Sequence, residues 1–299
     1  MDKNNDIATR VVFSGSYSDT EEVKTLRIEE GIVEIAENAF RDFQSMEEIY
    51  LPRSLRKISA CAFSGCKNLK KVVMEEGLEE IGDEAFSSCS SLTGVNIPDS
   101  VKRIGEGCFE GCASLTHLKL SESVYMIGSC AFAYCFNLTH VTVPDSCVLV
   151  EFNAFAYCFS LEGVKLSDNM ALIDESLFEG CRSLTDVDMP KRLRKIGRRA
   201  FKDCKSLRSI ILPVGTESIG FDAFFGCEGL LRIAIPRATT ELEDLDVFGS
   251  CDSLKEISYG GSEEEWELLT RGQTLTVRRS DLTLGTPKIT VMNIKEDYE

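Results

Sequence analysis

Histidine and tryptophan are almost absent from this chain of 299 residues, which contains two histidines and one tryptophan. The scarcity of imidazole argues against most acid–base and nucleophilic triads, because histidine is the side chain that titrates near neutral pH. No glycine-rich phosphate loop follows a strand-like segment, and carboxylates are spread along the chain rather than concentrated at one place. We therefore predict no catalytic residues, no cofactor and no enzymatic activity.

Two further patterns are missing. No Cys-x-x-Cys pair occurs, which argues against a zinc site, and we predict no bound metal. No run of apolar residues is long enough to span a bilayer, and no hydrophobic segment of the signal-peptide kind follows Met1. We expect a cytoplasmic protein that does not insert into a membrane.

Phenylalanine, in contrast, recurs every twenty-three residues through most of the chain. A fixed period of this length indicates a solenoid, in which each repeat buries its apolar side only against its neighbours. The final member of the series comes one residue late, and the full set is Phe40, Phe63, Phe86, Phe109, Phe132, Phe155, Phe178, Phe201, Phe224 and Phe248.

Other positions repeat with the phenylalanine and predict the local structure. Apolar residues nine and eleven places after it, such as Val95 and Ile97, have the two-residue spacing of a strand. Ala85, Phe86 and Cys89 have a spacing that places them on one face of a short helical turn. An isoleucine recurs five residues before the phenylalanine, and the glycines that follow it, such as Gly82, are expected to adopt positive φ. Each repeat is thus predicted to be strand, turn and helical turn.

Stacking of such units predicts an α/β repeat fold, with parallel strands in one elongated sheet and helical turns on the other side. Residues 23–28 follow the repeat pattern without its Phe and Cys, which indicates an N-terminal capping unit. Ser262 resembles a helix N-cap before an acidic turn and Trp266, which indicates a capping helix at the other end. We divide the chain into an N-terminal cap (1–33), a solenoid of about ten repeats (34–259) and a C-terminal cap with tail (260–299).

The repeat resembles the BspA-like leucine-rich repeat family. The residues that carry the resemblance are Leu115, Leu118, Leu120, Ile127, Gly128, Ala131, Phe132 and Cys135, with Tyr259 to Ser262 leading into Trp266 as a similar closing segment. The resemblance implies a right-handed leucine-rich-repeat solenoid and a protein–protein interaction module, with the sheet face as the usual partner surface. It also implies two alternatives to the expectations above, namely an adhesin of an anaerobic bacterium or protozoan and a location at the cell surface or outside the cell.

Cysteine is frequent, with thirteen residues, and nine of these occupy one repeat position three places after the phenylalanine. We interpret them as small fillers of a narrow core. The many thiols and their odd number favour a reducing setting. The four cysteines outside this position are better candidates for a reactive thiol, and they are Cys61, Cys108, Cys130 and Cys147.

The two histidines, His117 and His140, lie eight residues after their phenylalanines and are expected side by side on neighbouring strands. With Lys119 and Thr142 they belong to a polar stripe on the sheet face, where a protein partner is expected. One alternative is that the pair binds a metal or small ligand weakly. The other is a solvated pair without a function.

The middle repeats carry apolar side chains where other repeats are polar. Exposed aromatic clusters of this kind are typical of interfaces, so we predict that the middle of the solenoid binds a protein partner or a second copy of itself. The alternative is a local thickening of the core. The residues concerned are Tyr125, Met126, Leu149 and Phe152 near the isoleucine position, and Tyr134, Phe136, Tyr157 and Phe159 around the cysteine position.

The eighth repeat is basic although the whole chain has a formal charge of −16. A basic band on an acidic rod is suited to an anionic or acidic partner, and a merely solvated basic face is the alternative. Nucleic acid is not expected, because the overall charge repels it and no stacking aromatics lie within the band. The candidate anion-binding residues are Arg194, Lys195, Arg198, Arg199 and Lys202.

Overall fold

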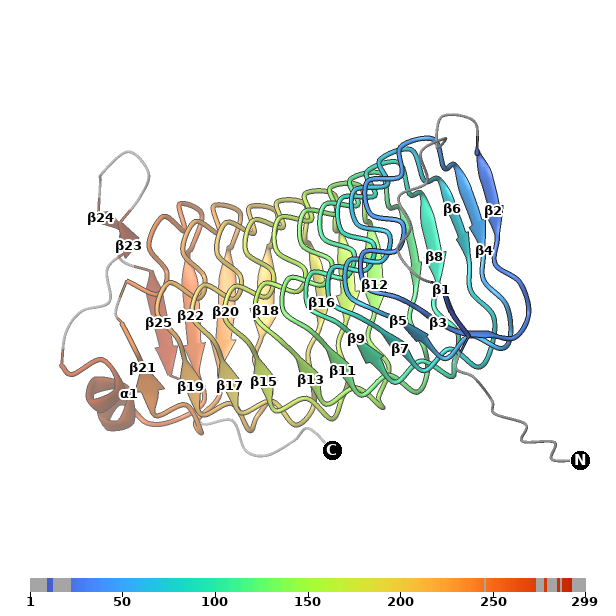
Figure 1. Ribbon diagram of the computed structural model, residues 1–299. Helices are drawn as coiled ribbons and strands as arrows, with labels where there is room; N and C mark the ends of the chain where they lie inside the picture. Colours follow the sequence, from blue (N-terminus) through green and yellow to red (C-terminus); the bar gives the residue numbers. More distant parts are fainter. Residues whose placement is uncertain are drawn as a thin grey trace, which may run out of the picture.

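The chain winds into an elongated rod in which each turn holds one repeat (Figure 1). This computed structural model describes residues 10–12, 23–244, 246–272, 277–278, 284–285 and 287–291. Much of the predicted N-terminal capping unit therefore lies outside the described residues, and so does most of the tail beyond residue 272. We number the repeats from one to ten, beginning with the repeat that contains Phe40.

Two parallel strand ladders run along the rod, not the single sheet predicted from the sequence. The first, the long-strand ladder, comes from the segment eight to ten residues after each phenylalanine, and the middle side chain of each strand points into the core. Its strands are β2 (Thr25–Arg27), β4 (Glu48–Tyr50), β6 (Lys71–Val73), β8 (Gly94–Asn96), β10 (His117–Lys119), β12 (His140–Thr142), β14 (Gly163–Lys165), β16 (Asp186–Asp188), β18 (Ser209–Ile211), β20 (Arg232–Ile235), β22 (Glu256–Tyr259) and β25 (Lys288–Val291).

The second, the short-strand ladder, comes from the isoleucine position five residues before each phenylalanine. Most of its strands have two residues, of which one points outward and one inward, so its sequence signature is a single apolar column. Its strands are β1 (Arg10–Val12), β3 (Ile32–Ile35), β5 (Lys57–Ile58), β7 (Glu80–Ile81), β9 (Arg103–Ile104), β11 (Met126–Ile127), β13 (Leu149–Val150), β15 (Leu172–Ile173), β17 (Lys195–Ile196), β19 (Ser218–Ile219) and β21 (Glu241–Leu242).

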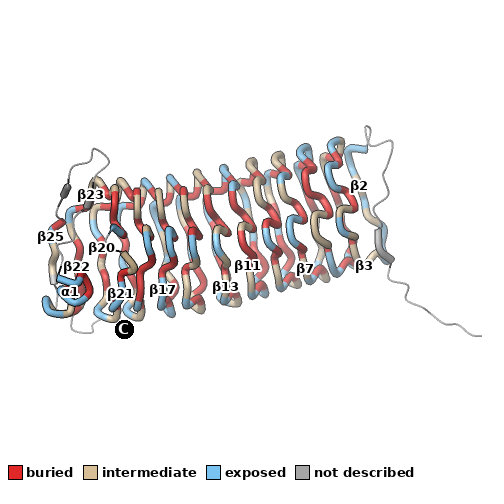
Figure 2. The backbone as a smooth tube through the Cα atoms, turned by 60° about the vertical axis from the view of Figure 1, so that its left-hand side comes forward, coloured by how far each residue is buried: buried red, intermediate tan, exposed pale blue. Residues whose placement is uncertain are grey.

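Hydrogen-bond pairing is interrupted at a few places along both ladders. The long-strand ladder is divided between β10 and β12 and between β16 and β18, and the short-strand ladder is divided between β13 and β15. The curvature and twist of the rod are visible in Figure 1. Buried segments recur in every turn of the chain along the whole rod (Figure 2), so the core is one continuous column.

The segment around each phenylalanine forms stacked tight turns, and the prediction of helical turns is wrong. Backbone N–H groups there donate alternately to a carbonyl three residues back and to a carbonyl of the next repeat, as Cys66 does to Phe63 and Phe63 does to Ala85. An α-helix would satisfy both within one segment. We call these segments the turn stack, and they make a third hydrogen-bonded column along the rod.

The phenylalanine rings of all ten repeats form a stack inside the rod. Neighbouring ring centroids are 5.1–5.9 Å apart and the rings are nearly parallel. Each ring is at most 4% exposed. Parallel displaced rings at this separation contribute about 0.5–1.5 kcal/mol per pair beyond the burial of their area. The stack therefore links each repeat to the next.

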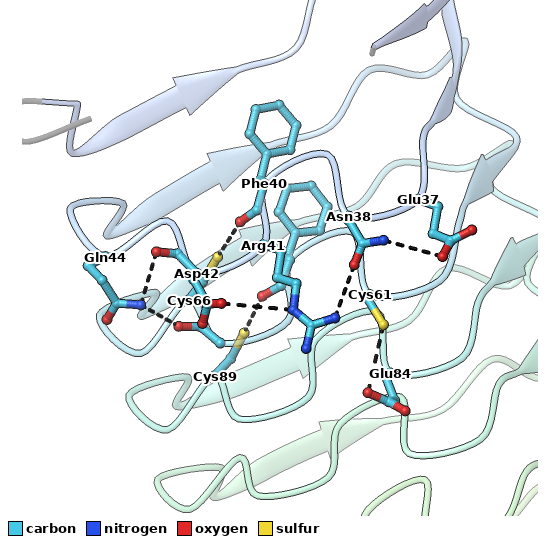
Figure 3. A network of polar contacts seen from close by, with 12 residues as sticks. Glu37, Asn38, Phe40, Arg41, Asp42, Gln44, Cys61, Cys66, Glu84 and Cys89 are labelled. Atoms are coloured by element: carbon cyan, nitrogen blue, oxygen red, sulfur yellow. Dashed lines mark hydrogen bonds and ion pairs between the residues drawn. The ribbon is translucent and has the colours of Figure 1, made fainter. Parts of the chain in front are cut away.

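The cysteine column confirms the core position predicted from the sequence and adds a polar contact. The Cys66 thiol donates to the Phe40 carbonyl oxygen at 3.1 Å (Figure 3), and the same contact recurs in every later repeat up to Cys251. A second donor thus reaches each of these buried carbonyls, which the turn hydrogen bond alone would leave with one partner. In the first repeat Phe43 takes the place of cysteine and packs edge-on against Phe40.

The cysteines outside this column are not activated thiols. Cys108 and Cys147 are buried, and burial raises the pKa of both thiols. Cys61 and Cys130 are half-buried, and burial also raises their pKa values. A raised pKa leaves less thiolate at neutral pH, so none of the four has the property expected of a reactive thiol.

Glycine after the isoleucine has a different role from the one predicted. Gly82 does not adopt positive φ, but a Cβ atom there would lie 2.8 Å from the Ile58 carbonyl oxygen. Its small size therefore allows the backbones of successive repeats to approach closely. Left-handed backbone occurs instead two residues before and two residues after the phenylalanine, in the second repeat at Cys61 and Gly65.

Helix α1 (Glu263–Leu269) lies at the C-terminal end of the rod and confirms the predicted capping helix. Ser262 and Glu265 form a capping box, in which each side chain accepts a hydrogen bond from the other's backbone N–H. Trp266 packs against Tyr259 with ring centroids 5.3 Å apart. Strand β25 covers the edge of β22, and β23 (Val277–Arg278) pairs antiparallel with β24 (Leu284–Gly285).

The buried thiols should make stability fall at alkaline pH. Burial raises the pKa of Cys112 and Cys158 to about 12, whereas a thiol in the unfolded chain titrates near about 8.5. Between these two pKa values the folded state keeps protons that the unfolded state releases. The contribution of each buried thiol to the free energy of unfolding is therefore complete below about pH 8.5. Above that pH each such thiol lowers the free energy of unfolding by about 1.4 kcal/mol per pH unit.

We expect the urea midpoint, measured under reducing conditions, to fall steeply between about pH 8.5 and 10. The double variant Cys112→Ser/Cys158→Ser serves as the control and should show a shallower fall, because a serine hydroxyl does not titrate in this range. If the urea midpoints of both proteins fell equally with pH, the buried thiols of the cysteine column would not be the cause.

Candidate interaction site

The outward side chains of the long-strand ladder form a flat polar face in the middle repeats. His117 and Lys119 of β10 and His140 and Thr142 of β12 are exposed, as the strand periodicity predicts. On the neighbouring strands, Gly94 of β8 pairs with His117 and Gly163 of β14 pairs with His140. This face therefore offers separated polar groups and no concentrated apolar contact.

The histidine pair lies on β10 and β12. Pairing is interrupted between β10 and β12, and the His140 ring lies over Gly163, on the side away from His117. His117 Nδ1 is 2.7 Å from the hydroxyl of Thr116. Within the described part of the chain, no group of three or more His, Cys, Asp or Glu side chains is placed to hold a metal ion.

Most of the basic band is neutralised by carboxylates of neighbouring repeats. Glu243 Oε2 accepts from Arg198 Nε at 2.9 Å, and its Oε1 lies 3.5 Å from Lys195 Nζ. The hydrogen bond from Arg198 lowers the pKa of Glu243. Arg194 pairs with Glu217 at 3.0 Å, and Lys202 lies 3.8 Å from Glu179. These pairs link repeats and reduce the charge available to an anion.

Arg199 differs from the rest of the band. It is exposed, has a left-handed backbone conformation with φ of 54°, and has no carboxylate within ion-pair distance among the described residues. Arg198, Arg199, Phe221 and Arg271 line an open groove, which acidic side chains also line. The mixed charge of this groove does not single out an anionic ligand.

The apolar residues of the middle repeats divide into two groups. One, the short-strand patch, lies on and beside β11 and β13, with Tyr125 48% and Phe152 45% exposed. Val148, which the sequence pattern did not single out, is 56% exposed and belongs to this patch. Met126 and Leu149 lie between these residues and are half-buried.

The second group, which we call the turn-edge cluster, consists of Tyr134, Phe136, Tyr157 and Phe159. Tyr134 stacks on Tyr157 with ring centroids 5.1 Å apart, and Phe136 stacks on Phe159 at 4.9 Å. Within each repeat the tyrosine meets the phenylalanine edge-on, at 6.2 and 6.4 Å. Tyr134 and Phe136 are exposed, so this two-by-two array of rings lies at the surface rather than in the core.

The contacts around the cluster hold its C-terminal side in place. The Tyr157 hydroxyl donates to Glu179 at 3.2 Å, and the Arg182 guanidinium lies 4.7 Å from the centroid of the Phe159 ring. Gly180 has left-handed backbone, and a Cβ atom there would lie 2.5 Å from the Tyr157 ring. The repeat on the N-terminal side has the small residues Gly111 and Ala113 at the equivalent positions. The rings therefore stand above that repeat.

Both tyrosines of the cluster occupy strained backbone positions. Tyr134 has φ of 61° and Tyr157 has φ of 60°, in a position that the other repeats fill with Asp, Gly or Ser. For a residue other than glycine the left-handed conformation costs about 1–2 kcal/mol. Strain of this kind is often kept at functional sites. No glycine in the sequence marks these two positions, which is why sequence reasoning found the aromatic rings but missed the strain.

The chain belongs to the BspA-type leucine-rich repeat family. The model of the BspA type leucine rich repeat region matches residues 33–162 and 149–267. This confirms the family resemblance and the repeat spacing of about twenty-three residues. The described solenoid of parallel strands agrees with this assignment, and the family is a repeat family whose members are typically not enzymes.

Several solved structures are similar to this chain. A leucine rich cell surface protein from Faecalibacterium prausnitzii is 27% identical, with 83% of this chain and 82% of that chain covered and a TM-score of 0.45. A leucine-rich repeat protein from Bacteroides ovatus is 25% identical, with coverages of 94% and 87% and a TM-score of 0.49. The leucine rich repeat protein of T. pallidum is 29% identical, with coverages of 62% and 78% and a TM-score of 0.47. No curated protein matches the sequence.

Removing the two tyrosines should leave the fold intact. In the variant Tyr134→Gly/Tyr157→Gly three ring contacts are lost, each contributing about 0.5–1.5 kcal/mol. This loss is offset by relief of left-handed strain of about 1–2 kcal/mol at each of the two positions. We expect the free energy of unfolding, measured in urea, to change by less than about 1 kcal/mol. Phe132→Ala, which removes a buried ring from the same repeat, should cost about 3–5 kcal/mol. A comparable loss in both variants would identify the tyrosines as core residues.

Proposed function

We propose that this protein is a non-enzymatic protein-interaction module that binds a protein partner through the turn-edge cluster. The observation that carries the proposal is a pair of stacked, strained tyrosines, Tyr134 exposed and Tyr157 half-buried, in a repeat position where other repeats have small or polar residues. Tyrosine is enriched among the residues that dominate binding energy at interfaces. Because the left-handed strain offsets the ring contacts, we expect the fold to gain little from these two tyrosines.

The turn-edge cluster is favoured over the other surfaces for two physical reasons. Its rings are held by stacking and by Gly180, Glu179 and Arg182, so little side-chain freedom remains to be lost on binding. The polar face around His117 and His140 lacks an apolar anchor, and the basic band is largely paired. The short-strand patch shares the apolar character of the cluster, but none of its residues has left-handed backbone.

The location of the protein is an expectation that fractionation of the producing cells would test. Cytoplasmic protein would agree with the first expectation drawn from the sequence, and protein at the cell surface would agree with the similarity to a cell surface protein of Faecalibacterium. No helix in the described residues has both the length and the apolar character needed to cross a bilayer. We propose an adhesive function only if the protein is found at the cell surface.

The binding proposal can be tested with the full-length chain immobilised under reducing conditions. Proteins captured from an extract of the producing cells are identified, purified and measured for direct binding to the wild type. We expect Tyr134→Gly/Tyr157→Gly to weaken that direct binding at least about tenfold, as loss of central aromatic contacts does at interfaces.

Val214→Ser is the matched control, because Val214 is an exposed apolar residue outside every candidate surface, and it should leave the affinity unchanged. Tyr125→Ser/Phe152→Ser tests the short-strand patch in the same assay. Equal binding by the wild type and the tyrosine variant would contradict the proposal, and a loss confined to Tyr125→Ser/Phe152→Ser would transfer the contact to the short-strand patch.

A further inference from the structure

We propose that the turn-edge cluster binds a second copy of this chain, arranged antiparallel about a two-fold axis between the fifth and sixth repeats. The inference rests on the proposed function of the same cluster and names its occupant. A two-fold axis that lies between two facing rods, perpendicular to their length, reverses the order of the repeats. Each column of equivalent positions then faces the same column of the other copy. The fifth repeat then faces the sixth, the fourth faces the seventh and the third faces the eighth.

The aromatic rings lie at the centre of this arrangement. The axis falls between the repeats that carry Tyr134 and Tyr157, so Tyr134 of each copy meets Tyr157 of the other, and Phe136 meets Phe159. Beside the cluster, Gly111 and Ala113 of the fourth repeat face Gly180 and Arg182 of the seventh. Central aromatic anchors surrounded by polar residues are the usual composition of a protein interface.

The charges on the turn stack are complementary under the same reversal. In the column two residues before the phenylalanine, the third repeat has Glu84 and the eighth has Arg199. Both are exposed and left-handed, and neither is in an ion pair among the described residues. At one strand spacing per repeat, each is about 12 Å from the axis. The arrangement places Glu84 of each copy against Arg199 of the other, twice in one dimer.

The column four residues after the phenylalanine agrees with this match. Lys67 of the second repeat faces Glu228 of the ninth in the same arrangement, and Glu228 also pairs with Lys205 of its own copy at 2.6 Å. The acidic pair Glu110 and Glu179 also meets, closer to the axis, but both side chains are half-buried and Glu179 already accepts from Ser176 and Tyr157. A face bound only to a foreign protein would have no reason to be self-complementary about the aromatic rings.

Light scattering of the purified full-length chain across a concentration series, under reducing conditions, tests the proposal. We expect a dimer that dissociates on dilution. Glu84→Arg and Arg199→Glu each place like charges together at both ends of the contact and should raise the dissociation constant at least about tenfold. The double variant Glu84→Arg/Arg199→Glu restores opposite charges and should return to within about threefold of the wild type.

Glu79→Arg makes the same change of charge at an exposed position outside the turn stack, and it should leave the dimer unchanged. A monomer at every concentration would overturn the proposal while leaving the proposed function to the direct-binding assay with a foreign partner. A dimer that neither single reversal weakens, or that the double reversal does not restore, would overturn the antiparallel arrangement.

Discussion

The stacking of one phenylalanine ring on the next is the interaction on which the rest of this structure depends. Ring separations of 5.1–5.9 Å are close to the spacing of hydrogen-bonded strands, so rings and strands advance along the rod together. The same register places each buried thiol under the phenylalanine carbonyl of the preceding repeat. A single repeat buries too little to fold alone, and its stability comes from these contacts with its neighbours.

This register also limits where function can lie. Inward side chains must repeat because they stack on one another. The two left-handed positions of the turns must also repeat, because the backbone of each repeat is hydrogen-bonded to the backbone of the next. Only outward side chains are free to differ between repeats. Tyr134 and Tyr157 differ where the backbone conformation disfavours them, which sets them apart from the aromatic residues of the short-strand patch. Contacts within the rod therefore explain the fold but not these two tyrosines.

The periodic columns were predictable from the sequence because each reports one buried position. Phe86 and Cys89 identified the core, and Ser262 with Trp266 identified the capping helix. The turn stack was mistaken for helix because Ala85, Phe86 and Cys89 have a spacing compatible with both. Two-residue strands have too short a pattern to be recognised. Pairing of Arg198 with Glu243, forty-five residues apart, depends on side chains that reach across two repeats and has no local signal.

The most direct measurement of the central claim is hydroxyl-radical footprinting of the full-length chain along a dilution series that spans association. Oxidation of Tyr134, Phe136, Tyr157 and Phe159 is compared with that of Tyr125 and Phe152 in the same sample. Our account predicts that the turn-edge cluster becomes protected as the chain associates while Tyr125 and Phe152 remain oxidised. Protection of Tyr125 and Phe152 with an unchanged turn-edge cluster would contradict it.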